Sequence, residues 1–79
     1  MNRDSAFENR FVVRRPHSSG FIFLRDLQDD EPVFCSRIEQ AWLFRKLNDA
    51  IQVAELFEAE VGRVLFNAQN HVVKTALMR

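Results

Sequence analysis

The residues best suited to catalysis are two histidines and one cysteine, and their spacing does not combine them. His17 and His71 lie far apart and lack the short spacing of a metal-binding pair. Cys35, the single cysteine, needs a base and an orienting group to act as a nucleophile, and no neighbouring residue supplies either. We therefore expect no catalytic site, no metal and no cofactor, and we expect the chain not to be an enzyme.

Acidic residues and glycines also invite a ligand-binding interpretation. The run Asp29-Asp30-Glu31 lacks the alternating ligands and the glycine of a calcium loop, so it predicts a solvated acidic loop. Gly20 fits a turn and Gly62 fits a helix end, and no glycine-rich phosphate loop is present. These residues therefore favour structural and surface roles.

Arginines gather near the beginning of the chain, at Arg10, Arg14, Arg15 and Arg25. In a predicted hairpin they would lie beside Phe21 and Phe23, which combines cations for phosphate with aromatic rings for base stacking. Phenylalanine at alternate strand positions is also typical of a core. Direct binding of nucleic acid through this hairpin is therefore our second hypothesis.

Trp42 and Arg45 lie where the predicted short helix gives way to the longer one, and they belong to the residue types that most often anchor protein interfaces. Packing of Trp42 on the sheet is the alternative. Glu55, Glu58 and Glu60 lie on an acidic helix face that suits either solvent or a basic partner. The candidate partner-binding residues are Arg14, Arg15, Arg25, Asp29, Asp30, Glu31, Trp42, Arg45, Glu55 and Glu58.

Length and composition limit the class of protein. The chain has 79 residues, with 11 basic and 11 acidic side chains, so its formal net charge is zero. That length predicts one small domain over 1–79, with flexible ends at 1–8 and 76–79. One cysteine excludes an internal disulfide, and no apolar run reaches the roughly 20 residues of a membrane span. The first eight residues lack the apolar region of a secretory signal, so we expect a soluble cytoplasmic protein without a membrane partner.

The zero net charge is a sum over segregated blocks of opposite sign. Residues 1–25 carry five Arg against two acidic residues, and residues 26–31 carry four acidic residues and no basic one. Such blocks form either solvated faces that pair internally or patches that recognise a partner. A uniformly basic nucleic-acid binder is excluded.

Four β-rich segments predict strands. Residues 11–15 and 21–25 flank a Pro- and Gly-containing turn and predict an antiparallel hairpin. Residues 63–67 predict a third strand. Residues 71–77 form either a fourth strand or a frayed tail, and residues 33–35 are expected to be briefly extended.

Two helices are predicted. Ser36 and Glu39 match a capping box for a short helix over 37–44. A longer helix over 49–61 would begin after Asn48 as its N-cap and end before Gly62, with an apolar stripe between them.

The predicted fold class is α+β, with a three- to four-stranded antiparallel sheet and one long and one short helix packed on one face. The opposite face would then be uncovered, and there Val12, Ile22, Leu24 or Leu65 would line a dimer or partner interface. The predicted core is Phe11, Val13, Phe21, Phe23, Ile38, Ala41, Phe44, Ile51, Ala54, Phe57, Val64 and Phe66.

The order of these segments resembles small phage and prophage proteins over about residues 10–67. The resemblance rests on Val33-Phe34-Cys35-Ser36, Ile38 to Phe44, Asn48-Asp49-Ala50, Val53-Ala54, Gly62 and Val64-Leu65-Phe66. Here Cys35-Ser36 replaces the more usual single threonine. Some such phage proteins inhibit host defence, including anti-CRISPR proteins. The resemblance implies a small binding protein in a host cytoplasm and carries over no functional residue.

Our leading hypothesis is a non-enzymatic protein-interaction module that binds and blocks a larger host protein or nucleoprotein complex. The missing catalytic set, the charge blocks and the surplus of apolar strand positions motivate it. The second hypothesis is the nucleic-acid-binding regulator with the Arg-rich hairpin. Homodimerisation is a third.

Overall fold

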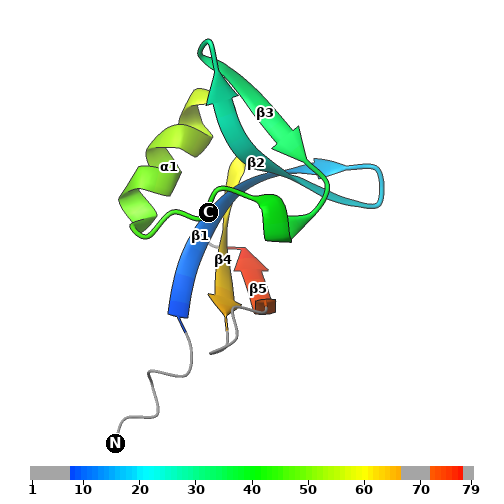
Figure 1. Ribbon diagram of the computed structural model, residues 1–79, viewed down its shortest axis with the longest axis vertical. Helices are drawn as coiled ribbons and strands as arrows, with labels where there is room; N and C mark the ends of the chain where they lie inside the picture. Colours follow the sequence, from blue (N-terminus) through cyan, green and yellow to red (C-terminus); the bar gives the residue numbers. More distant parts are fainter. Residues whose placement is uncertain (1–7, 67–71, 78–79) are drawn as a thin grey trace, which may run out of the picture.

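The computed structural model describes residues 8–66 and 72–77, and Figure 1 shows their arrangement. Five strands form one antiparallel sheet in the order β3-β2-β1-β4-β5, which confirms the α+β class. The elements in chain order are β1 (Glu8–His17), β2 (Gly20–Gln28), β3 (Glu31–Cys35), the 3-10 helix η2 (Ile38–Gln40), α1 (Leu47–Leu56), β4 (Glu60–Phe66) and β5 (Val72–Leu77).

The three predicted strands are present, and of the two alternatives for 71–77 the structure has the strand, β5. Residues 33–35, expected to be briefly extended, belong to a fifth strand, β3. Its hairpin with β2 turns at Asp29 and Asp30, whose φ values are 55° and 66°. Two successive positive φ values define the tight turn that matches the twist of a hairpin, and aspartate tolerates this conformation better than most residues. The acidic run therefore folds the chain back on itself instead of forming a loop.

The sheet divides near the middle of β1. β1 pairs with β4 from Glu8 to Arg14 but with β2 only from Arg14 to His17. A bulge between Leu24 and Asp26 accompanies the departure of β2 from β1.

An irregular segment, residues 42–44, fills the space between the diverging strands. The Trp42 amide donates to the Leu24 carbonyl at 2.9 Å, and Phe44 exchanges two backbone hydrogen bonds of 2.8 Å with Phe11. The segment thereby gives β1 a hydrogen-bonded neighbour where β2 does not.

These backbone bonds also explain why the predicted helix over 37–44 is confirmed only in part. Only Ile38–Gln40 is helical, as a 3-10 turn, and its N-cap Arg37 receives no side-chain bond. The capping box of Ser36 and Glu39 is therefore absent. A chain that must run extended to pair with β1 and β2 cannot continue a helix to Phe44.

α1 begins earlier than the predicted start at Asp49. Its first residue is Leu47, and its N-cap is Lys46, which has extended φ and ψ and no side-chain cap. Asn48 lies inside the first turn instead of capping it. The cap prediction from Asn48 is therefore wrong.

α1 also ends at Leu56, five residues before the predicted end. Glu58 adopts a left-handed φ of 54°. The Ala59 amide donates to the Ala54 carbonyl at 2.8 Å, and the Glu58 amide donates to the Glu55 carbonyl at 3.5 Å. These two bonds form a Schellman motif, in which glycine usually occupies the left-handed position. Gly62 is not the helix end; it lies in β4 opposite Val12.

Glycine at position 58 should therefore stabilise the protein. We expect Glu58→Gly to raise the free energy of unfolding by about 0.5 kcal/mol, because relief of the left-handed strain exceeds the added entropy of the unfolded chain. Urea denaturation followed by circular dichroism measures the change. As a control, Gln52→Gly inside α1 should lower the free energy by about 1 kcal/mol. Equal losses for both variants would contradict the assigned helix end.

The core occupies both faces of the sheet, so α1 and the 36–43 segment do not share one face as predicted. Figure 1 shows α1 and η2 on either side of β1. Consecutive residues Val12 and Val13 point to opposite faces and belong to separate clusters. One cluster joins Val13, Leu24, Phe44, Ala50, Ala54 and Val61; the other joins Val12 and Val64 with Phe23, Ile38, Ala41 and Leu43 packed against them.

Coverage of both faces overturns part of the predicted interface. Val12 and Leu24, which we expected to be exposed, are 1% and 0% exposed. Ile22 and Leu65 are half-buried. Phe21, which we expected in the core, is 39% exposed.

The remaining core predictions fare better. Val13, Phe44, Ala54 and Val64 are buried as predicted. Five others pack against the two clusters, namely Phe11, Phe23, Ile38, Ala41 and Ile51. Phe57 is half-buried, and the Phe66 side chain lies outside the part of the chain that is described.

Candidate binding surfaces

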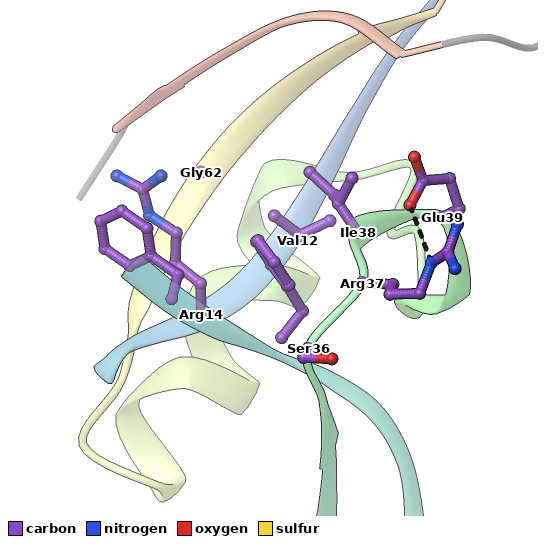
Figure 2. A pocket seen from close by; sticks show the side chains of 9 residues that line it. Val12, Arg14, Ser36, Arg37, Ile38, Glu39 and Gly62 are labelled. Carbon is purple, nitrogen blue, oxygen red and sulfur yellow. Dashed lines mark ion pairs between the residues drawn. The ribbon is translucent and has the colours of Figure 1, made fainter. Parts of the chain in front are cut away.

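A groove lies on the sheet face away from α1, and Figure 2 shows its side chains. Its volume is about 420 Å³, and we call it the sheet groove. Val12, Phe23 and Ile38 give it an apolar floor that belongs to the second core cluster. The full lining is Val12, Arg14, Phe21, Phe23, Ser36, Arg37, Ile38, Glu39 and Gly62.

The sheet groove is open because few side chains cover its apolar floor. Gly62 pairs directly with Val12 and contributes no side chain to this face. η2 packs over Val12 and Val64 through Ile38. Phe21 remains 39% exposed at the rim.

Arg14 forms one rim of the sheet groove. Its guanidinium carbon lies 4.0 Å from the centre of the Phe21 ring, and its Nε donates to Glu60 Oε1 at 3.0 Å. The Arg14 side chain is only 11% exposed. A cation–π contact and a charge-assisted hydrogen bond thus fix the Phe21 rim from one side.

Arg37 and Glu39 form the opposite rim, joined by an ion pair of 3.8 Å (Figure 2). Both side chains are largely exposed, and such pairs contribute little to stability. Their charges are therefore available for a partner. Neither residue was predicted as a binding residue from the sequence, because both lie in the predicted capped helix over 37–44.

Arg15 points to the other face of the sheet. Its guanidinium carbon lies 4.8 Å from the centre of the Phe34 ring, and it donates to the Phe57 carbonyl at the end of α1. Arg15 thereby satisfies a helix-terminal carbonyl that would otherwise lack a partner. Arg14 and Arg15 consequently do not form one basic patch. Arg25 is exposed in β2, next to the bulge.

Asp29, Asp30 and Glu31 are exposed at the β2–β3 turn. They remain together at one tip of the sheet. They do not line the sheet groove or the second groove, which is described next.

A second groove, which we call the Trp42 groove, lies between residues 42–45 and α1. Its volume is about 380 Å³. Trp42 is 39% exposed and stacks on Phe44, with ring centres 4.6 Å apart and an interplanar angle of 21°. The lining residues are Trp42, Leu43, Phe44, Arg45, Asp49, Gln52 and Val53, so the structure brings Trp42 and Arg45 together.

The remaining candidates lie around the end of α1. Glu55 is exposed on the helix, and Glu58 is exposed in the turn that follows it. Neither lines the Trp42 groove. Glu60, which the sequence placed on the same acidic face, turns instead to Arg14.

The residues considered for catalysis lie apart. His17 is exposed at the end of β1. Cys35 is half-buried at the end of β3, and its thiol donates to the Arg37 carbonyl at 3.3 Å. Within residues 8–66 and 72–77, no three His, Cys, Asp or Glu side chains come together in a way that could hold a metal ion. His71 lies outside the described residues.

No protein-family model, curated protein or solved structure matches this chain. In the described part of the chain, no helix has the length and apolar character required to cross a membrane. The two grooves and the residues that shape them are therefore the features that bear on function.

Proposed function

We propose that this chain is a non-enzymatic protein-interaction module that docks through the sheet groove onto a larger protein or nucleoprotein complex and blocks it. Such an action would match that of the small phage-encoded inhibitors that its sequence resembles, in the cytoplasm of a host cell. The observation that carries the proposal is the exposed Phe21 ring beside an open apolar groove.

The Phe21 ring is held in place before any partner binds. Arg14 covers the ring at 4.0 Å, and Glu60 fixes Arg14 at 3.0 Å. A side chain that is already ordered loses little conformational entropy on association, which favours affinity. Aromatic and arginine side chains are also the most frequent anchors of protein interfaces.

The shape and charge of the sheet groove suit an apolar side chain presented by a protein. A volume of about 420 Å³ falls within the range of roughly 300–1,000 Å³ typical of ligand pockets. The floor is apolar, and Arg37 and Glu39 at the rim offer one charge of each sign for polar contacts around the inserted side chain. This arrangement of an apolar centre and a polar rim is typical of protein interfaces.

Comparative capture from the native cell tests the proposal. Tagged wild-type protein should retain a defined partner, and Phe21→Ser should reduce its recovery at least about tenfold, as for an interface anchor worth more than 1.4 kcal/mol. Leu56→Ser is the matched control, because Leu56 is 73% exposed but lies on α1. It should retain the same partner.

Equal recovery of every captured protein by both variants would contradict the proposal. Capture of nucleic acid alone would favour the regulator hypothesis. A dimer mass in light scattering that disappears in Phe21→Ser, with no other partner captured, would assign the groove to homodimerisation.

A further inference from the structure

We propose that the Trp42 groove binds a cationic side chain, an arginine above all, presented by a basic segment of a protein partner. The proposal adds a second contact surface to the proposed function and rests on it only in assigning the cation to a protein. It depends on an aromatic ring and a carboxylate that line the same groove.

The ring is that of Trp42. One of its faces is covered by the stacked Phe44 ring, and the side chain nevertheless remains 39% exposed. Tryptophan is the best aromatic partner for a cation, because its ring face carries negative charge density. The cations that do contact aromatic rings in the described residues are Arg14 on Phe21 and Arg15 on Phe34. Trp42 is therefore available to a cation from outside.

The carboxylate is that of Asp49, which is exposed in the first turn of α1 and lines the groove with Gln52. Within residues 8–66, the ion pairs found are Arg10–Glu8, Arg14–Glu60 and Arg37–Glu39, so Asp49 has no cation of its own. α1 contains no lysine or arginine. The helical wall of the groove is consequently anionic.

Arg45 lines the same groove, and its positive charge would favour an anionic ligand over a cationic one. It forms no ion pair with Asp49 and does not cover Trp42 in the part of the chain described. An incoming arginine can therefore stack its planar guanidinium on Trp42 and donate to Asp49 without displacing an existing contact. A carboxylate ligand would find Arg45 but would face Asp49 and the electron-rich ring.

The fluorescence of Trp42 tests the proposal directly, because the chain has one tryptophan and no tyrosine. Titration with an arginine-rich peptide should change the emission to saturation, whereas a glutamate-rich peptide of equal length should not. Asp49→Asn should lower the affinity for the arginine-rich peptide about threefold or more, which is the range for a partly desolvated ion pair. Asp26→Asn, the same charge change at an exposed position of β2, should leave affinity unchanged.

The Trp42→Leu variant has no fluorophore, so its binding is measured by calorimetry. It should no longer bind the arginine-rich peptide. Stronger response to the glutamate-rich peptide, or equal affinity of Asp49→Asn and wild type, would overturn the proposal. Emission changes produced only by a single-stranded oligonucleotide would also overturn it and assign the ring to base stacking. None of these results depends on Phe21, so they leave the test of the sheet groove separate.

Discussion

Replacing Phe44 by alanine should remove a large part of the stability of this protein. Phe44 is 6% exposed, packs among Val13, Leu24 and the alanines of α1, and supports the Trp42 ring. Loss of a buried phenylalanine costs about 3–5 kcal/mol, because apolar burial is lost and a cavity remains. A domain of this size has a total of roughly 4–12 kcal/mol. Urea denaturation followed by circular dichroism and Trp42 emission measures the loss.

Phe44→Leu is the control, because it keeps an apolar side chain at this position. Leucine keeps most of the apolar contact, so it should cost about 1.5 kcal/mol or less and leave a cooperative transition. A loss below 1 kcal/mol for Phe44→Ala would show that residues 42–44 are not part of the cooperative core. In that case the Trp42 groove would lack a fixed wall.

The strands are the part of the fold that the sequence predicts well. Residues 11–15 and 21–25 combine β-branched and aromatic side chains around a turn, so local preferences are enough to define the hairpin. Only residues 33–35 of β3 were expected to be extended, because the strand begins with Glu31 and Pro32 and follows Asp29 and Asp30. Local patterns gave no sign that Asp29 and Asp30 form a two-residue turn.

The assignment of faces fails for a different reason. Val12 and Leu24 were expected at an interface because a sheet with helices on one side leaves the other side open. Leu24 instead lies on the α1 side, among Phe44 and the alanines of the helix. The 36–43 segment covers the Val12 side without being a helix, and its position depends on hydrogen bonds from residues 42–44 to β1 and β2. Such long-range pairing leaves no periodic signal in the sequence.

The candidate site was predicted in part. Trp42 and Arg45 were chosen by residue type and do share a groove. Phe21 and Arg14 were chosen, but as core and phosphate ligand, because neither their mutual contact nor the pairing with Glu60 follows from spacing in the sequence. Arg37 and Asp49 gained importance only through the grooves that they line.

The Arg14–Glu60 pair yields the second large effect. Glu60→Gln should lower the free energy of unfolding by about 2 kcal/mol, because the amide carries no negative charge and the guanidinium of Arg14, 11% exposed, is left without a counter-ion. Arg14→Met should cost a similar amount. The double variant should lose less than the sum of the two, by about 1 kcal/mol or more, as expected for groups in direct contact.

A matched control is the exposed pair of Arg10 and Glu8, whose ion-pair distance is 2.7 Å. Glu8→Gln should change stability by less than about 0.5 kcal/mol, because solvent screens that pair. Additive losses at Arg14 and Glu60 would contradict the assigned contact. Strong coupling would mean that Arg14 is committed to Glu60, and nucleic-acid binding through Arg14 would then require breaking an internal ion pair. A strong coupling would therefore count against the nucleic-acid hypothesis for Arg14 before any partner is known.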